Sequence, residues 1–546
     1  MAKAKFDDQA RAGLSLIAPP FLYALVILAA PLLTILAYSF LTDGYLEIIR
    51  DFTLDNYTQV LTDPIVRTVM LRSLVVAAIV TLATVVMAFP VAYYVSFCVR
   101  PEKKAMWLFL ITIPFWTSYL IRVFLWKVIL GYNGVINSSL TGLGIIDEPL
   151  TFILYNTNAI VLTLAHAYAP FAILPIFVAL EKIDRSLLEA GRDLGESRLM
   201  TFWRVTLPLA MPGVIAAVLI VFIPTIGDYV TPDPGPDAGA GQPAPGIGAG
   251  GDGNGHRGGG QPGLPVPQPP LPQGAPMNRQ GRGLQAYAIF YLLFLYAPII
   301  LLPMFAFNSG TIIAFPLQGV TTDWFRQMWA DATLRRALTN SLTVAVASSI
   351  LATCFGIFAA RASTRFVFPG KGGMMGFIML PMVLPEIIVA MSLLVVLLGM
   401  GVQLSLMTVI AGHTLICMPY AIAVLTTAFS SLDRSLEEAA YDLGETKWGA
   451  FRLVTLPLVM PGIISALLIS FTISLEEFIL AFFLAGNEPT LPTYIFSQLR
   501  FPRAIPVIMA LGTVLVILSI VLLAIGEYFR RRGNARIGGK PTGGLM

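Results

Sequence analysis

Long apolar runs separated by short polar segments make up most of this chain. Each run has about 20 residues or more, enough for a helix to cross roughly 30 Å of hydrocarbon. The runs lack the alternation of barrel strands, and a helix satisfies its backbone hydrogen bonds within one segment. The pattern therefore predicts an all-α fold, a polytopic transmembrane helical bundle. The predicted spans are Leu14–Phe40, Val69–Phe97, Ala105–Leu130, Ala159–Leu180 and Gly213–Val230, then Leu284–Phe307, Ser341–Ala360, Met374–Met400, Leu406–Phe429, Gly462–Leu484 and Ala504–Tyr528, which makes 11.

The polar segments alternate in charge, and the basic ones are expected on the cytoplasmic side. They are Lys3–Arg11, Arg100–Lys104, Lys182–Arg204, Arg279–Arg282, Arg361–Lys371, Arg434–Arg452 and Arg530–Arg536. Each half of the chain is therefore predicted to begin inside. The segments Gly131–Thr157 and Asn308–Asn340 then face outward.

The chain also repeats itself. Residues Asp184–Gly213 match Asp433–Gly462 at a constant offset of 249, with 19 of 30 positions identical. A period this long indicates duplicated domains rather than a solenoid. Both copies follow a fourth span, so the two domains are predicted to be parallel repeats about an axis normal to the membrane.

A segment rich in glycine and proline separates the two domains. In Pro232–Pro276, 26 of 45 residues are Gly or Pro, a composition typical of a disordered linker. Five spans from a cytoplasmic start leave Val230 outside, whereas Arg279 and Arg282 favour an inside start for the second domain. A twelfth span is therefore missing at this place. One interpretation is an out-of-frame reading of that span, with Met277 as the start of a separate permease; the other is a true fusion. The nucleotide sequence across these codons distinguishes the two.

The resulting domain organisation has three parts. Residues 1–231 are predicted to form a first membrane domain with five spans, and residues 283–546 a second with six. Residues 232–282 are the linker. The repeated loops fall within 181–213 and 430–462.

Composition supports the membrane assignment and disfavours an enzyme. The chain is 56% hydrophobic and 12% charged, with a mean hydropathy of +0.77. Its three cysteines and its histidines lack metal-ligand spacing, so no metal or cofactor is expected. There is no phosphate-binding Gly-x-x-x-x-Gly-Lys-[Ser/Thr] sequence, so ATP hydrolysis would require separate subunits.

The repeated loop carries the most specific motif. Each copy has a short charged helix, an Asp-Leu-Gly sequence suited to ending a helix, and a stretch that ends in Met-Pro-Gly. Two such copies indicate a surface that a partner grips. A tight loop with interfacial helices would explain one copy better than two.

These loops resemble the EAA coupling loop of binding-protein-dependent ABC importer permeases. The resemblance implies an inner-membrane permease that couples to two ABC ATPase subunits on the cytoplasmic side and to a periplasmic substrate-binding protein, with membrane lipid around it and no nucleic acid. It implies that the loop helices dock on the ATPases. Gly191 departs from the usual second alanine, a change expected to leave docking intact. The implied coupling residues are Glu189, Ala190, Gly191, Asp193 and Gly195 in the first copy and Glu438, Ala439, Ala440, Asp442 and Gly444 in the second.

Further segments resemble the spermidine/putrescine permease pair. They are Pro114–Arg122, Gly134–Asn137 and Phe222–Asp228, which look like its first subunit, and Leu380–Ile388 and Ser474–Glu477, which look like its second. This resemblance implies transport of a small cationic solute.

Acidic residues inside spans normally face a cavity or a partner, and carboxylates and aromatic faces both attract ammonium groups. The predicted substrate pathway is Trp116, Tyr119, Asp228, Glu386, Glu476 and Glu477. Alternatively, these acids are solvated near the helix ends or pair with Arg122. A ferric-iron permease is the nearest alternative importer. A secondary transporter, a channel or a scaffold would leave the two EAA-like loops unexplained.

Overall fold

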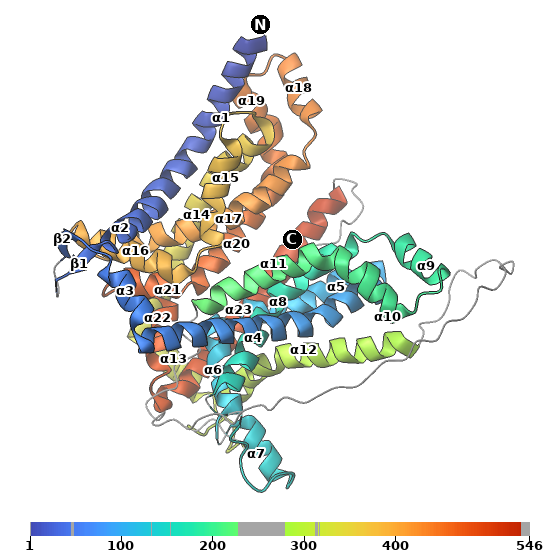
Figure 1. The fold of residues 1–546 in the computed structure, drawn as a ribbon, viewed down its shortest axis with the longest axis vertical. Helices are drawn as coiled ribbons and strands as arrows, with labels where there is room; N and C mark the ends of the chain where they lie inside the picture. Colours follow the sequence, from blue (N-terminus) through green and yellow to red (C-terminus); the bar gives the residue numbers. More distant parts are fainter. Residues whose placement is uncertain are drawn as a thin grey trace, which may run out of the picture.

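The computed structural model describes residues 2–44, 48–132, 134–152, 154, 156–227, 279–311, 315 and 317–536, and almost all of its regular structure is helical (Figure 1). The linker prediction for 232–276, and the missing span with it, lies outside these residues. The elements of the first domain are α1 (Ala2–Ala24), η1 (Leu25–Ala29), α2 (Ala30–Tyr38), β1 (Leu41–Asp43), β2 (Ile48–Phe52), α3 (Asp55–Thr62), α4 (Pro64–Tyr93), η2 (Tyr94–Cys98), α5 (Pro101–Thr112), η3 (Ile113–Trp116), α6 (Tyr119–Leu130), α7 (Val135–Gly142), α8 (Thr157–Glu181), α9 (Arg185–Asp193), α10 (Arg198–Thr201), η4 (Phe202–Thr206) and α11 (Leu207–Ile226).

The second domain follows a similar order and adds α21, α22 and α23 at its end. Its elements are α12 (Arg279–Ala306), α13 (Asp323–Ala330), α14 (Ala332–Arg365), α15 (Lys371–Met379), η5 (Leu380–Met382), α16 (Glu386–Gly399), α17 (Leu406–Ser430), α18 (Arg434–Asp442), α19 (Lys447–Ala450), η6 (Phe451–Thr455), α20 (Leu456–Glu476), α21 (Ile479–Leu484), α22 (Leu491–Gln498), η7 (Pro502–Ala504) and α23 (Ile505–Arg536).

Nine helices in the described part of the chain are long and apolar enough to cross a membrane, and a bent helix pair makes ten. A further apolar helix, Pro502–Leu518, is shorter. The predicted polytopic helical bundle is confirmed, while the count of 11 spans stays a prediction. The first β-hairpin, β1 with β2, is antiparallel and was not expected from the sequence.

Both third spans are interrupted, although the sequence predicted each as one continuous helix. In the first domain the break lies at η3 and the residues that follow it, before α6 begins. In the second, the axes of Lys371–Met382 and Glu386–Gly399 meet at 97°. Pro114, Pro381 and Pro385 stand at these breaks; proline lacks an amide hydrogen and its ring clashes with the preceding turn. The fifth span of the second domain ends earlier than predicted, because its helix ends at Glu476 and α21 starts a new one.

The first helix of each domain packs on the other domain. The buried face of α1, with Ile17 and Ala24, lies in one apolar core with residues of α14 and α17, and the Tyr23 hydroxyl donates to the Ala411 carbonyl at 2.6 Å. Conversely, α12 packs on α4 and α8, and the Tyr287 hydroxyl donates to the Met87 carbonyl at 2.9 Å. The exchange ties the two repeats into one molecule.

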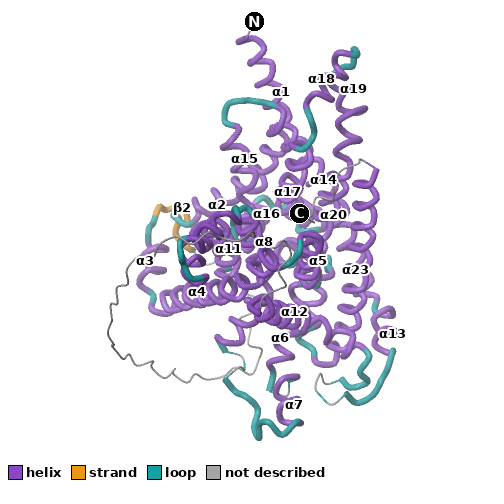
Figure 2. Tube along the Cα trace, turned by 90° about the vertical axis from the view of Figure 1, so that its right-hand side faces the viewer, coloured by secondary structure: helices purple, strands orange, loops and turns teal. Residues whose placement is uncertain are grey.

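The two helical bundles diverge from one end. In Figure 1 they meet near α13, α21 and α22 and spread apart toward α9 and α10 on one side and α18 and α19 on the other. Figure 2 shows the α18–α19 end projecting from the molecule in the perpendicular view, with α7 and α13 toward the opposite end. The repeated loops therefore occupy the two separated tips.

Candidate functional site

The repeated loops form two equivalent helix–turn–helix tips. Asp184 begins α9, and its carboxylate accepts a hydrogen bond from the Ser186 amide at 3.0 Å. Asp433 begins α18 in the same way, with the Ser435 amide at 3.0 Å. The Ser186 and Ser435 hydrogen bonds hold the pKa of both carboxyls below the usual range. A depressed pKa means that each cap stabilises its helix above the ordinary aspartate pKa and is lost as pH falls through the lowered value.

Each tip helix ends at the predicted glycine. Gly195 has φ +84° and Gly444 has φ +90°, a left-handed conformation that side chains with a Cβ adopt at a cost. In the second copy the Gly444 amide donates to the Tyr441 carbonyl and the Glu445 amide to the Ala440 carbonyl, at 2.9 and 3.0 Å. These are the paired bonds of a Schellman motif, and the first copy has the same pair. The Asp-Leu-Gly helix stop is confirmed.

The predicted coupling residues divide into an exposed and a buried set. Gly191 and Ala440 are buried against the tip, while the others are exposed: Glu189, Ala190, Asp193, Gly195, Glu438, Ala439, Asp442 and Gly444. Sequence reasoning missed the leucines at the turns. Leu194 and Leu443 are 85% and 86% exposed, so each tip carries an exposed apolar side chain at its turn.

Packing explains why Gly191 is a glycine rather than an alanine. A Cβ built on Gly191 would lie 3.3 Å from Thr201 Cγ2, which is tighter than ordinary contact. At the offset of 249, the second copy has Ala440 and Ala450 in place of Gly191 and Thr201. The extra methyl on the helix is thus accompanied by a smaller residue opposite, which conserves the packed volume.

We therefore expect Gly191→Ala to reduce the melting temperature of the purified protein slightly, and Gly191→Ala with Thr201→Ala to restore it. Overpacking of a well-packed site typically costs about 1–3 kcal/mol, whereas a volume-conserving pair costs less. Thr201→Ala alone is the matched control. Equal melting temperatures for the Gly191→Ala single and double variants would contradict this explanation.

Three of the predicted pathway acids meet where helices break. Glu386 is the first residue of α16, Glu476 the last of α20, and Glu477 follows it before α21. The Glu386 and Glu477 carboxyls lie within interaction range of each other, and Glu477 Oε1 accepts from the Leu480 amide at 3.0 Å. Bent helices thus bring these acids to one place within the bundle.

The first domain contributes a cation to this cluster. Arg122 of α6 is 3% exposed, donates to the Ala167 carbonyl at 3.4 Å, and lies close enough to Glu476 for electrostatic attraction. The alternative in which an acid pairs with Arg122 therefore fits Glu476.

The remaining predicted pathway residues come from the first domain. Asp228 lies outside the described residues, but a Cβ on its neighbour Gly227 would be 3.1 Å from Pro385 Cβ, so α11 ends beside the start of α16. The structure describes the backbone of Trp116 at the end of η3 but not its side chain. Tyr119 starts α6, and its ring centroid is 6.5 Å from that of Tyr168.

Two aromatic residues near the cluster were missed by sequence reasoning. Tyr168 of α8 contacts Tyr119, and Tyr420 of α17 lies within electrostatic range of Glu386 and Glu477. Both are in fourth spans and adjoin or nearly adjoin a proline, Pro170 and Pro419. Their shared position beside a proline in a fourth span could have identified both residues from the sequence.

The buried histidines have hydrogen-bond partners. His166 Nε2 donates to the Leu295 carbonyl at 3.0 Å, and His413 Nδ1 lies 2.8 Å from Ser474 Oγ. Among the described residues, no three His, Cys, Asp or Glu side chains gather at a metal-binding distance. Both histidines act here as polar packing groups.

Known proteins resemble this chain over both domains. The family model described as "Binding-protein-dependent transport system inner membrane component" matches twice, at residues 61–233 and 352–537. The spermidine/putrescine transport system permease protein PotB of Escherichia coli (strain K12) is 42% identical over 205 residues, 37% of this chain and 73% of that protein. The permease protein PotC of the same system in Haemophilus influenzae is 31% identical over 250 residues, 46% of this chain and 96% of that protein.

A solved bacterial ABC transporter that imports alginate aligns with 48% of this chain at 17% identity, with a TM-score of 0.38, a likeness too low to bear on the substrate. The twofold family match, the PotB and PotC relatives and the apolar helices identify a multi-pass inner-membrane protein with two permease domains. The chain belongs to the family of binding-protein-dependent transport system inner membrane components, and it carries that domain twice in one polypeptide.

Proposed function

We propose that this ABC importer permease moves a small cationic solute, a polyamine such as spermidine or putrescine, across the membrane by alternating access. The observation that carries the substrate class is the Glu386–Glu477 pair, two carboxyls held together at helix breaks inside the bundle. Buried acids among spans are costly and mark substrate paths by default. The PotB and PotC relatives, whose names give spermidine and putrescine, support the same class.

The tips would transmit the ATP-driven conformational change of the ATPase subunits to the spans. Separate ATPase subunits bind the exposed faces of α9 and α18, and a periplasmic binding protein delivers the solute at the opposite end. Because the tips stand apart in this structure (Figure 1), approach of two ATPases toward each other would draw the bundles together at this end. The acid cluster, accessible from one side of the membrane before this movement, would then be accessible from the other side.

A competition experiment tests the substrate. The chain, its ATPase subunits and its binding protein are reconstituted in vesicles that contain ATP, and uptake of labelled spermidine is measured. Excess unlabelled putrescine or spermidine is expected to reduce uptake strongly, and ferric ion is expected to leave it unchanged. Uptake of labelled ferric ion without spermidine uptake would favour the iron permease instead.

A second function, a secondary transporter, is separated by the same vesicles. An importer driven by ATP shows no uptake when ATP is absent or the ATPase subunits are omitted. Uptake driven by an ion gradient alone would contradict the proposal.

A further inference from the structure

The two tips are joined to their spans by different chemistry. In the second domain, Glu437 of α18 is 9% exposed although it is charged. Its Oε1 lies 3.4 Å from Arg365 Nε at the end of α14 and accepts from the Thr455 hydroxyl of η6 at 2.9 Å. One carboxylate therefore connects the tip helix to two spans at once.

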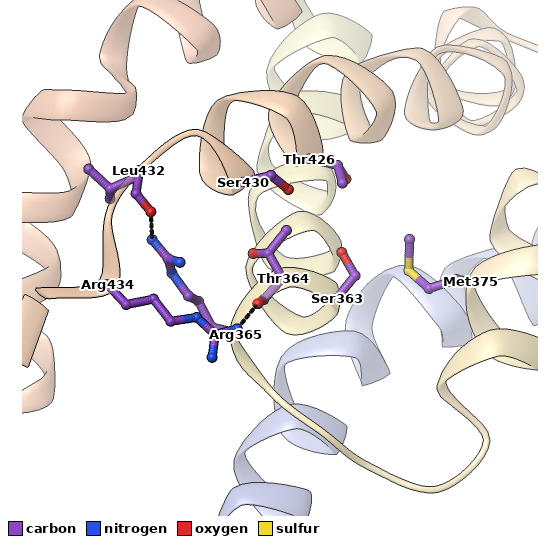
Figure 3. Close-up of a pocket in the computed structure, with 8 residues that line it drawn as sticks. All are labelled: Ser363, Thr364, Arg365, Met375, Thr426, Ser430, Leu432 and Arg434. Carbon is purple, nitrogen blue, oxygen red and sulfur yellow. Dashed lines mark hydrogen bonds between the residues drawn. The ribbon is translucent and has the colours of Figure 1, made fainter.

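The arginine is fixed by further contacts. Arg365 donates to the Leu432 carbonyl at 3.0 Å, and Arg434 of the tip donates to the Thr364 carbonyl at 2.7 Å (Figure 3). One turn earlier on α14, the Arg361 guanidinium lies 4.2 Å from the centre of the Phe451 ring. The side chains of Arg365 and Glu437 are 8% and 12% exposed, so water screens this pair little.

The first domain shows which positions correspond. Arg185 donates to the Ser96 carbonyl as Arg434 does to that of Thr364, which sets offsets of 249 for the tip and 268 for the second span. The buried positions of α4 and α14 match at the same offset of 268, for example Ala88 with Gly356.

At these offsets the charged pair is replaced by apolar residues. Leu188 stands for Glu437 and Phe97 for Arg365. Tyr93 stands for Arg361, and its ring contacts Phe202, the counterpart of Phe451, at 6.2 Å between centroids. At this level the first tip is linked to its span by the Tyr93–Phe202 ring contact and by the Arg185–Ser96 hydrogen bond.

The first domain has an ion pair between α5 and α8. Lys104 of α5 donates to Glu181, the last residue of α8, at 2.6 Å, and the Ser96 hydroxyl donates to the same carboxylate at 3.1 Å. In the second domain Ser430 replaces Glu181, and a cavity of about 480 Å³ lies at this place, lined by Ser430, Thr364 and Arg434 among others (Figure 3). The ion pair of the second domain includes the tip helix α18, whereas in the first domain Arg204 of η4 donates to Glu196, in the turn after α9, at 2.9 Å.

We propose that Arg365 and Glu437 are positioning residues that transmit movement of the second tip to α14 and α20, and that the two tips therefore couple unequally. This inference rests on the proposed function. The hydrogen bond from the Thr455 hydroxyl to the Glu437 carboxylate is directional, and the buried ion pair with Arg365 holds the same carboxylate, whereas apolar contacts allow two helices to shift past each other. Because α20 ends at Glu476, these contacts also join the second tip to the span that leads to the acid cluster.

The test transplants the first domain's residues into the second. The variant R365F/E437L replaces the charged pair by its counterparts and leaves neither member of the pair without the other. R365K keeps the cation, E437Q keeps the hydrogen-bond acceptor for Thr455 but removes the charge, and K104Q/E181Q removes the first domain's ion pair between α5 and α8 as the matched control. Each is reconstituted with its ATPases and binding protein, and solute transported per ATP hydrolysed is measured beside the melting temperature.

The expected result is a fall of about fivefold or more in transport per ATP for R365F/E437L and E437Q, the lower end of typical coupling between sites. R365K is expected to retain most of the wild-type ratio. K104Q/E181Q is expected to lower the melting temperature without changing the ratio. A wild-type ratio in a folded R365F/E437L complex would overturn the inference while leaving the proposed function intact. Absence of ATP-dependent uptake by the wild-type complex would instead refute the proposed function.

Discussion

Replacement of Gly444 by aspartate is expected to abolish transport while the chain still folds. At φ +90° any side chain with a Cβ is strained, by roughly 1–2 kcal/mol, and the aspartate also adds a charge beside the exposed Leu443. A partner that covers this tip would have to bury that charge without a counter-ion. We expect uptake in the reconstituted vesicles to fall below a tenth of the wild-type rate, because about 1.4 kcal/mol suffices for a tenfold loss.

Gly401 provides a matched control for this substitution. It has φ +71°, and no atom lies within 4 Å of a Cβ built on either glycine. Gly401→Asp therefore carries similar backbone strain and the same charge away from the tips. Near-normal uptake by Gly401→Asp with loss by Gly444→Asp would assign the effect to coupling. Normal coupling by Gly444→Asp would remove the tip from the mechanism.

Replacement of Glu386 and Glu477 together by glutamine is expected to remove most uptake of a polyamine. A hydrogen bond that involves a charged group contributes about 1.5–3 kcal/mol, which corresponds to roughly tenfold or more in affinity. Glutamine has nearly the same shape as glutamate, and the two glutamine side chains can still hydrogen-bond to each other. Uptake is measured over a range of solute concentrations, together with ATP hydrolysis stimulated by the loaded binding protein.

Glu476→Gln is the matched control, because Glu476 faces Arg122 rather than the carboxyl pair. We expect the double variant to lose uptake and to keep part of the stimulated hydrolysis, since the tips are unchanged. Glu476→Gln should leave more of the uptake. Wild-type uptake by Glu386→Gln/Glu477→Gln would place the cationic path elsewhere.

The repeat made the tips readable from sequence. Gly195 and its counterpart Gly444 act through local backbone bonds, so the helix stop could be predicted without tertiary information. The spans were equally clear, because hydrophobic length alone identifies them. Features that depend only on a short stretch of the chain could therefore be predicted.

Features that depend on distant partners could not be predicted. Pro114, Pro381 and Pro385 were recognised, but whether a proline kinks a span or bends it by 97° depends on what packs around it. The meeting of Glu386 with Glu477 needs two helices to break at the same level. The buried charge of Glu437 looks in the sequence like any acid on a polar helix, and its counterpart Leu188 is the one hint that this position is internal.

The exchanged first helices determine which parts can travel as rigid bodies. Because α1 packs on α14 and α12 on α4, each moving lobe is a mosaic of both repeats, and its boundary does not follow the order of the chain. A covalent link between Tyr23 and Phe355, whose ring centroids are 4.9 Å apart, would join two parts of one lobe and leave the transport cycle free. A covalent link between α11 and α16, beside Gly227 and Pro385, would connect the two lobes and is expected to arrest the transport cycle. If the two repeats were produced separately, each lobe would still need the first helix of the other repeat. Neither repeat could therefore form a complete lobe alone.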